Sequence, residues 1–282
     1  MFWLDGTLHA TSRLPFDVAD RGLLLGDGVF DTSLVLGGKM VWREAHVARL
    51  LEAATTLGFT LDPARVAEGI DAVLSGAQHG SLRITATRGS GPRGLAPPAE
   101  PKPSLLVTLA PLRPQALFAP LKLHLTDIRR NDTSPISRMK SLNYLDGVLA
   151  SREALGAACD DALFLDTRGN VACTSVGNVF VLIGDTLATP PMADGVVPGI
   201  VRRVLLDTCD DLGLEGVERS LSLADLERAD EVFVTNSLRL VASVNAIGRK
   251  ACASGAQVEA LSAHVARLVR AETGVDPRQL AH

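Results

Sequence analysis

The sequence has little excess charge and no long apolar run, and each absence excludes a class of protein. The formal net charge is -4, the pI is about 5.9, and no Lys/Arg cluster with interleaved aromatic residues occurs, so nucleic acid is not an expected partner. The longest uncharged run, residues 171–184, falls short of the ~20 apolar residues that a membrane span requires, so no membrane partner is expected either.

Cysteine and histidine are too sparse to suggest a metal centre. The four cysteines have no Cys-x-x-Cys spacing and the six histidines form no His-x-x-x-His pair, which argues against zinc and against a disulfide scaffold. Reduced thiols in a cytoplasmic protein are the simplest interpretation, and an N-terminus without a cationic segment predicts no signal peptide. The 282 residues, 46% of them hydrophobic, suffice to bury the cores of about two domains.

Lysine is scarce, and this narrows the search for a reactive amine. The 28 basic residues comprise 23 arginines and only five lysines: Lys39, Lys102, Lys122, Lys140 and Lys250. The other four are interpreted as hairpin-tip, loop or strand-surface residues, whereas Lys140 lies between a predicted strand and a helix expected to start near Leu142. Desolvation there would lower the pKa of the lysine and free its amine for Schiff-base chemistry, although a surface lysine near a helix start fits the spacing equally well.

Arginines in two further stretches are candidates for binding anions. A helix is predicted over residues 43–57, and His46 and Arg49 flank its apolar stripe. On one interpretation both are ordinary residues at the boundary of the stripe. On the other, Arg49 is a fixed cation that binds a phosphate. A glycine-rich loop, Arg88–Leu95, carries Arg88 and Arg93; it is not a Walker A loop, and its arginines suit carboxylates unless the loop is a solvated hairpin tip.

The predicted strands and helices occur in groups. Strand meanders lie on both sides of a proline-rich stretch, residues 111–120, which is the best domain boundary. In the second half residues 195–203 lead into a predicted helix that runs to about Leu212, and free backbone N–H groups at its start would favour an anion. This grouping favours an α+β fold over a doubly wound parallel sheet.

Several short motifs follow one another in an order that is typical of a known family. They are Arg21 with Gly26–Phe30, the pair His46 and Arg49, Lys140–Leu145, Gly177–Phe180, Pro198–Ile200, and Thr235–Ser237. Together they make the chain resemble, from Phe2 to roughly Arg270, the fold-type IV (class IV) pyridoxal-phosphate enzymes. That group contains branched-chain aminotransferases, D-amino-acid aminotransferases and 4-amino-4-deoxychorismate lyases.

The resemblance implies a two-domain α+β fold and a pyridoxal 5'-phosphate cofactor. A small N-terminal domain would cover residues 1–112, a linker 113–120, and a larger pseudo-barrel domain 121–282, the last carrying Lys140. The resemblance also implies a homodimer with the active site near the subunit interface.

Functional roles are implied by the same matches. Lys140 matches the lysine that forms the Schiff base and moves the proton. Arg49 matches the arginine that binds the cofactor phosphate, assisted by the N–H groups of Ile200 and Val201 and by Ser237. In branched-chain members, a tyrosine matching Tyr144 reaches the 3-hydroxyl of the cofactor.

One position departs from the family pattern. Most members carry an acidic residue five positions before the asparagine of the Gly-Asn-Val-Phe segment, where it bonds the pyridine nitrogen, and here that position is Cys173. A neutral thiol cannot stabilise a pyridinium as a carboxylate does. Cys173 is thus expected to face the cofactor, and the cofactor ring is expected to be a weaker electron sink. The alternatives are that the reaction tolerates a neutral pyridine, or that a thiolate or another group takes the role of the carboxylate.

The arginine loop bears on the substrate. In the familiar D-amino-acid aminotransferases a histidine stands at the position of Leu95, and a tyrosine usually stands at that of Phe30. The loop 88–94 is more similar to the lyases, and so is the segment Thr235–Leu238. The expected substrate side consists of Phe30, Thr32, Arg88 and Arg93.

Three functions follow from these similarities, and the first is favoured. It is a lyase that releases pyruvate and 4-aminobenzoate, a folate precursor, from 4-amino-4-deoxychorismate, whose two carboxylates suit several arginines. The second is an aminotransferase acting on D-amino or branched-chain amino acids with a 2-oxo acid acceptor. The third is a catalytically silent cofactor-binding protein, which Cys173 makes conceivable.

Overall fold

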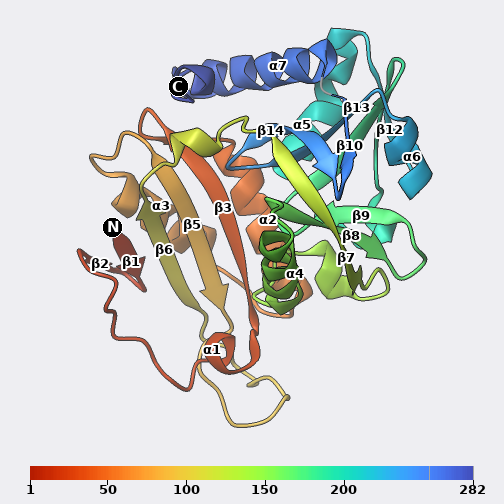
Figure 1. Ribbon diagram of the computed structural model, residues 1–282. Coiled ribbons are helices and arrows are strands. Elements are labelled where there is room, and N and C mark those ends of the chain that lie inside the picture. Colours follow the sequence, from red (N-terminus) through yellow and green to blue (C-terminus); the bar gives the residue numbers. More distant parts are fainter. Residues whose placement is uncertain (254, 282) are drawn as a thin grey trace. The chain divides into compact units, whose positions relative to one another are not determined.

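The structure is a computed structural model that describes residues 1–253 and 255–281 (Figure 1). It divides into two compact units. Unit 1 comprises Met1–Arg113, Lys140–Asn143 and Glu272–Val275, and unit 2 comprises Pro114–Met139, Tyr144–Ala271 and the residues from Asp276 onward. Each unit combines helices with a multi-stranded sheet, so the predicted α+β class is confirmed.

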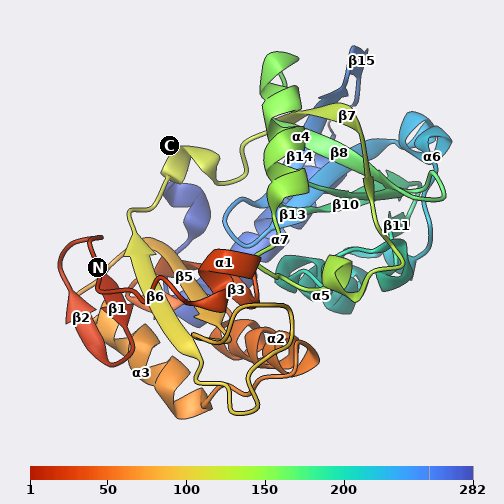
Figure 2. The ribbon, with the colours of Figure 1, turned by 90° about the horizontal axis from the view of Figure 1, so that it is seen from below.

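Unit 1 is built on a sheet in the order β2–β1–β6–β5–β3–β4. The strands are β1 (Phe2–Leu4), β2 (Thr7–His9), β3 (Gly28–Leu36), β4 (Lys39–Met40), β5 (Gly80–Thr87) and β6 (Ser104–Ala110). Two helices, α2 (Arg43–Thr56) and α3 (Pro63–Leu74), lie along the same side of this sheet (Figure 2). The approach is close, because a Cβ on Gly69 of α3 would lie 2.8 Å from both Trp3 and Val107.

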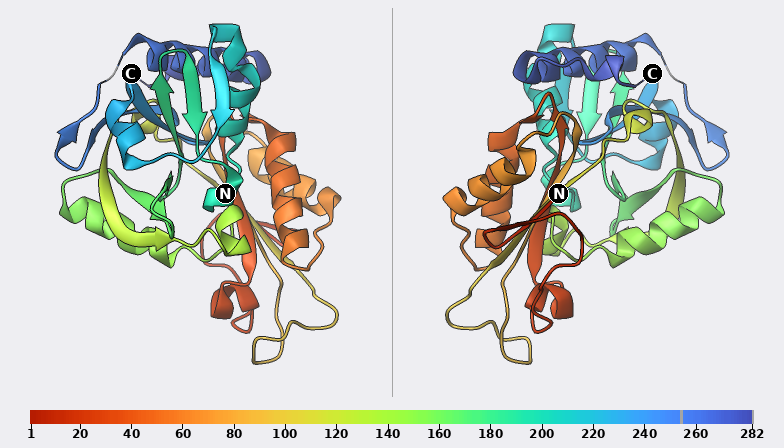
Figure 3. Two further views of the ribbon diagram at one scale, coloured as in Figure 1. Left: turned by 90° about the vertical axis from the view of Figure 1, so that its right-hand side faces the viewer. Right: turned by 90° about the vertical axis from the view of Figure 1, so that its left-hand side faces the viewer.

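Unit 1 also contains a short helix, α1 (Arg21–Leu25). Asp20 caps it by accepting from the N–H of Gly22, which is the usual role of aspartate at a helix start. The guanidinium of Arg21 donates to three carbonyls of the loop between β5 and β6, those of Gly94, Leu95 and Ala96. Figure 3 shows this loop extending beyond the ends of both strands, so Arg21 of α1 anchors its protruding part.

Unit 2 contains a barrel-like mixed sheet. Its strands are β7 (Leu121–Arg130), β8 (Asp161–Asp166), β9 (Val171–Thr174), β10 (Asn178–Ile183), β11 (Thr186–Thr189), β12 (Glu215–Glu218), β13 (Glu231–Asn236), β14 (Leu240–Ile247) and β15 (Lys250–Ala251). The order β10–β13–β14–β7–β8–β9 closes on itself because Cys173 of β9 pairs with Asn178 of β10. Alternate apolar residues of these strands, such as Leu121 and Leu123 or Val232 and Val234, form one buried cluster, as the two-residue period of a strand requires.

The helices of unit 2 are α4 (Leu145–Gly156), α5 (Ile200–Thr208), α6 (Leu223–Arg228) and α7 (Ala256–Thr273). Short 3-10 helices cover Pro114–Ala116, Pro135–Arg138, Met192–Asp194, Cys209–Leu212 and Pro277–Gln279. Figure 2 shows α4 beside β7 and β8, which it contacts. No helix in the described ranges is both long and apolar enough to cross a membrane.

The division of the chain differs from the expected one at Lys140. We expected this lysine in the C-terminal domain, but Lys140–Asn143 groups with unit 1, and so does Glu272–Val275. The physical reason is backbone pairing, since Lys140 and Leu142 hydrogen-bond to β3. Unit 2 begins at Pro114, directly after Arg113, so the expected linker over residues 113–120 is not a separate segment. Helix α4 consequently starts at Leu145, three residues later than predicted.

Candidate active site

Lys140 is held against the open edge of β3 by its backbone. The N–H of Phe30 donates to the carbonyl of Lys140 (2.8 Å), and the N–H of Leu142 donates to the carbonyl of Gly28 (2.9 Å). Gly28 has no room for a side chain, because a Cβ there would lie 2.5 Å from the Ala86 carbonyl and 2.8 Å from Leu142. The segment after residue 139 therefore adds to the sheet like a short extra strand, which fixes the point from which the lysine side chain starts.

Two cationic side chains lie over the ring of Phe30. The guanidinium carbon of Arg83 is 3.7 Å from the ring centroid, and Nζ of Lys140 is 4.7 Å from it. Thr32 pairs with Arg83 across β3 and β5, so Phe30, Thr32 and Arg83 project from one face of the sheet. The structure thus brings together Lys140 and two predicted substrate residues. Arg83 was missed, although its cross-strand position opposite Thr32 could have indicated it once the strands were paired.

The other face of β3 carries a buried carboxylate cluster. Asp31 is 1% exposed and accepts hydrogen bonds from Nε and Nη2 of Arg49, both at 2.8 Å, and from Nδ1 of His46 at 2.7 Å. Burial opposes ionisation, but the hydrogen bond from His46 and the charge of Arg49 outweigh it and hold the pKa of Asp31 well below its usual range. Both partners come from one face of α2, since they are three residues apart.

His46 is neutral in this cluster. Burial, together with Arg49 and Lys140, holds its pKa below the ordinary value of 6.5 despite the opposing effect of Asp31. An ionised carboxylate only accepts, so Nδ1 carries the hydrogen and Nε2 carries the lone pair. Nε2 is buried without a hydrogen-bond partner among the described residues. A buried acceptor of this kind is costly in a closed core and is typical of functional positions.

The two arginines predicted in the glycine-rich loop differ sharply. Arg88 is 6% exposed, and each of its three nitrogens donates within unit 1, to Asp27 and to the carbonyls of Leu57 and Gly58. Those bonds explain its burial and give it a structural role in place of the predicted substrate contact. Arg93 is exposed on the loop anchored by Arg21.

In unit 2, the start of α5 and the end of β13 lie side by side. Thr235 of β13 pairs with Asn178 of β10, and Oδ1 of Asn178 would lie 2.0 Å from a Cβ on Gly199, the residue that precedes α5. Asn178 also donates to the carbonyl of Val197 (2.9 Å), which orders the approach to the helix. Only glycine fits at residue 199, so the Gly-Asn and Pro-Gly motifs serve one local contact.

The start of α5 has the chemistry of an anion site. No side chain caps this helix, and the first N–H groups, which include those of Ile200 and Val201, have no acceptor within it. Oγ1 of Thr235 is buried and lacks a partner among the described residues, and Ser237 follows two positions later in a turn capped by Asn236. Hydroxyl and N–H donors in one place suit a phosphate.

Two further predicted residues belong to unit 2. Tyr144 immediately precedes α4. Cys173 is 8% exposed and lies in an apolar cluster with residues of α4 and β8, among them Ala154 and Phe164. The strand that carries it, Val-Ala-Cys-Thr, has no acidic residue. In the described part of the chain, no group of three or more His, Cys, Asp or Glu side chains is arranged to hold a metal ion.

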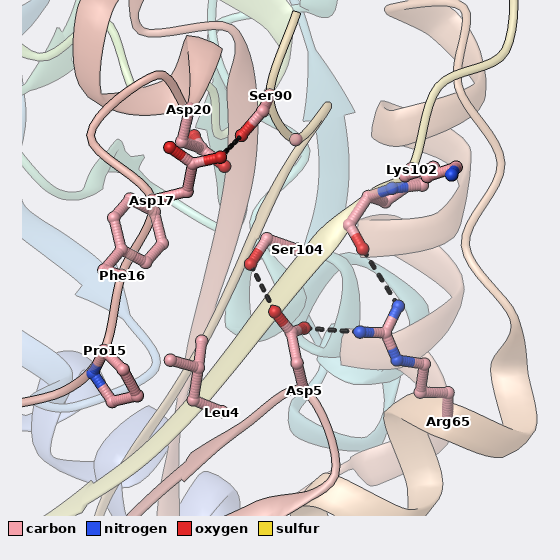
Figure 4. A pocket seen from close by; sticks show the side chains of 12 residues that line it. Leu4, Asp5, Pro15, Phe16, Asp17, Asp20, Arg65, Ser90, Lys102 and Ser104 are labelled. Carbon is pink, nitrogen blue, oxygen red and sulfur yellow. Dashed lines mark hydrogen bonds and ion pairs between the residues drawn. The ribbon is translucent and has the colours of Figure 1, made fainter.

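A separate cavity of about 440 Å³ lies in unit 1 beside the loop between β5 and β6 (Figure 4). Its carboxylates are engaged within the unit: Asp5 with Arg65 and Ser104, Asp17 with Ser90, and Asp20 with the cap of α1. None of the predicted site residues lines it. It therefore has no part in the site argued from the sequence.

Comparison with known proteins identifies the class. The family described as "Amino-transferase class IV" matches residues 28–247, so the chain belongs to this family of enzymes. A protein from Methanocaldococcus jannaschii, named provisionally as a branched-chain-amino-acid aminotransferase, is 33% identical over 241 residues, which are 83% of either chain.

Two relatives are lyases. The aminodeoxychorismate lyase of Bacillus subtilis is 30% identical over 244 residues, covering 84% of this chain and 83% of its own. The crystal structure of 4-amino-4-deoxychorismate lyase from Pseudomonas aeruginosa is 30% identical, covers 95% of this chain and 98% of its own, and superposes with a TM-score of 0.85. The expected family and the fold-type IV architecture are thereby confirmed.

Proposed function

We propose that the chain binds pyridoxal 5'-phosphate and uses Lys140 as its reactive amine. The family resemblance assigns the phosphate of this cofactor to Arg49, to the N–H groups of Ile200 and Val201 and to the hydroxyl of Ser237, all of which are donors that suit an anion. The unpartnered Oγ1 of Thr235 supports the assignment, because a buried hydroxyl requires a partner. When bound, the cofactor supplies an aldehyde that condenses with amines and a ring that withdraws electrons.

We further propose that the reaction is the release of pyruvate and 4-aminobenzoate from 4-amino-4-deoxychorismate. The position of Arg83 is the observation that supports a substrate with a carboxylate. Its guanidinium lies over the same Phe30 ring as Nζ of Lys140. A guanidinium at this position can orient the substrate carboxylate while the amine of Lys140 transfers the proton beside it. The similarity of the loop 88–94 to lyases, and the likeness to the Pseudomonas lyase, favour this reaction over transamination.

The roles of the residues follow from the balance of the reaction. Nζ of Lys140 would take the ring proton, the bond between the ring carbon and the enolpyruvyl oxygen would break, and Nζ would return a proton to the departing group. No oxidant, reductant or water is consumed. Phe30 and Thr32 would line the substrate side with Arg83, and Arg93 would contribute a second cation from the exposed loop. Tyr144 would approach the cofactor hydroxyl, and Cys173 its ring nitrogen.

A homodimer is part of the proposal. Helix α1 of unit 1 exposes Leu23, Leu24 and Leu25, and helix α4 of unit 2 buries only Ala150 and Ala154 while exposing Leu145, Val148, Leu149 and Leu155. Apolar stripes of this kind usually mark protein interfaces. Light scattering of the purified protein would give the mass.

An aminotransferase is the second candidate, and the 33% identity to the Methanocaldococcus protein favours it. Incubation with 4-amino-4-deoxychorismate decides between them: the lyase releases 4-aminobenzoate and pyruvate. If neither product forms while D-alanine or leucine donates its amino group to a 2-oxo acid, the reaction is transamination.

A silent cofactor-binding protein, suggested by Cys173, would bind the cofactor and do neither reaction. The variant Lys140→Ala tests the role of the lysine that all three functions require. It should abolish turnover and the visible absorbance that the cofactor acquires on binding to the lysine. A wild-type protein that never acquires this absorbance would contradict the cofactor assignment itself.

A further inference from the structure

We propose that Asp31 is a positioning residue that orients Arg49 for anion binding, and that His46 acts by holding Asp31. The proposal rests on the assignment of Arg49 to the cofactor phosphate and adds a residue that the sequence motifs did not single out. It follows from the geometry of the cluster on β3 and α2.

The contact between Asp31 and Arg49 is a two-pronged one. Nε donates to Oδ2 and Nη2 to Oδ1, each at 2.8 Å. A guanidinium is planar and rigid, so two bonds along one edge fix both its plane and the direction in which its opposite edge faces. The arginine side chain is only 10% exposed, which further limits its motion. Asp31 thereby determines where an anion meets Arg49.

Asp31 is itself fixed from two further sides. Its Oδ1 accepts from the N–H of Thr32 (2.7 Å) and from Nδ1 of His46 (2.7 Å). Because His46 is neutral, it contributes a hydrogen bond without adding a charge. Removal of His46 should therefore loosen the carboxylate while leaving the charges of Asp31 and Arg49 unchanged.

Charge and position predict opposite effects when Asp31 is neutralised. The carboxylate offsets the positive charge of Arg49, so on electrostatic grounds alone Asp31→Asn should strengthen anion binding. If Asp31 instead orients the guanidinium, the same change should weaken anion binding, because the arginine loses its fixed direction. The sign of the effect separates the two roles.

The experiment compares the dissociation constants of pyridoxal 5'-phosphate and pyridoxal, which lacks the phosphate, by absorbance titration of the full chain. The ratio used below is the dissociation constant of pyridoxal divided by that of pyridoxal 5'-phosphate. It measures the preference for the phosphorylated form and therefore reports on the phosphate contact alone. Asp31→Asn should lower the preference for the phosphorylated form about tenfold, as expected for losing a hydrogen bond to a charged group. His46→Asn should lower it by a smaller factor.

Asp27→Asn is the matched control. Asp27 is also a carboxylate between two guanidiniums of unit 1, since it accepts from Nε of Arg21 (2.8 Å) and of Arg88 (2.7 Å), and its side chain is only 14% exposed. This variant should lose thermal stability and keep the wild-type ratio. In an Arg49→Met background, Asp31→Asn should cause no further drop in the ratio, whereas a general structural role would add one.

An unchanged or increased ratio in a folded Asp31→Asn protein would overturn the proposal, as would a further drop in the Arg49→Met background. If Asp31→Asn does not fold, His46→Asn decides, because an unchanged ratio in that variant is equally incompatible with the proposal. A wild type that binds neither compound would refute the proposed function, while a wild type that prefers the phosphorylated form confines any failure to the role of Asp31.

Discussion

Two arginine clusters, one in each unit, use the same kinds of side chain in opposite proportions. In unit 1, one carboxylate, that of Asp31, takes donors from Arg49 and His46. In unit 2, one guanidinium, that of Arg168, meets three carboxylates: Asp132 at 3.3 Å, Asp166 at 3.0 Å and Asp194 at 2.7 Å. In the first cluster one cation balances one carboxylate, whereas the second has more carboxylates than its cation can neutralise.

This difference supports the proposal that an anion binds at the first cluster, whereas the second cluster is structural. The negative surplus around Arg168 raises its pKa, chiefly through the hydrogen bond with Asp166, and repels any further anion. Asp166 also accepts from the N–H groups of Arg168 (2.9 Å) and Asn170 (2.8 Å), which shapes the turn between β8 and β9. The Asp31 cluster has no such surplus, so an anion near Arg49 is tolerated.

The largest effect is expected from Arg49→Met. It leaves the carboxylate of Asp31 buried without its cation, which costs roughly 3–5 kcal/mol of unfolding free energy. The preference for pyridoxal 5'-phosphate over pyridoxal should fall roughly 100-fold, since charge-assisted bonds to the phosphate are lost. Urea denaturation and ligand titration measure the two effects.

Arg168→Met is the counterpart of that variant in unit 2. It should lower the stability of the protein and leave the ligand preference unchanged, because no anion is expected there. A fall in the preference as large as that of Arg49→Met would remove the distinction between the two clusters.

A smaller effect is expected from Asp166→Ala. The side chain is 0% exposed and accepts from two backbone N–H groups, from Arg168 and from the amide of Asn170. Donors left without partners cost roughly 1–3 kcal/mol, which calorimetry or urea denaturation would detect. Asp166→Asn serves as the control, because it keeps an acceptor for the turn while removing the charge, and it should lose less stability than the alanine variant.

The sequence predicted two of the three members of the Asp31 cluster. His46 and Arg49 stood out because they flank an apolar helical stripe, and the structure places them together. Asp31 did not, since an aspartate within a strand-like run next to Gly26–Gly28 is indistinguishable from a turn residue. Its role depends on the pairing of β3 with the helix that follows, which local patterns do not encode.

The Arg168 cluster and the position of Lys140 lay largely beyond local patterns. Asp166 is only two residues from Arg168, but Asp132 and Asp194 come from distant segments that only the tertiary fold brings to this arginine. Helix periodicity placed the start of α4 at Leu142, but pairing of residues 140–143 with β3 overrides it. The α+β class and the helix predicted over residues 43–57, which the structure shows at Arg43–Thr56, followed directly from the sequence.

The two clusters should also differ in their response to pH. The pKa of His46 is lowered in the folded state, so between about pH 7 and pH 5 the unfolded chain binds a proton that the folded chain does not. Stability therefore falls on acidification, by at most about 1.4 kcal/mol per pH unit for this residue. Asp31 and Asp132, whose pKa values are also lowered, lose their contributions only at lower pH.

His46→Asn should accordingly flatten the stability profile between pH 7 and 5, whereas Arg168→Met should shift the profile without changing its slope there. His264, whose pKa burial also lowers, contributes a slope of the same sign from unit 2, and His264→Asn is the control. Urea denaturation at each pH gives the profile. An unchanged slope in His46→Asn would contradict a lowered pKa of His46 in the folded protein.

The smallest effect is expected from an ion pair that has the same distances as the Asp31 cluster but lies in water. Nε of Arg203 donates to both carboxylate oxygens of Asp207 at 2.8 and 2.6 Å, yet the two side chains are 76% and 53% exposed. Asp207→Ala should change the unfolding free energy by only about 0.3–0.5 kcal/mol, and less in high salt. If this variant cost as much as Arg49→Met, distance alone would explain both pairs. Burial, which removes the competing water, would then not be what makes Asp31 decisive.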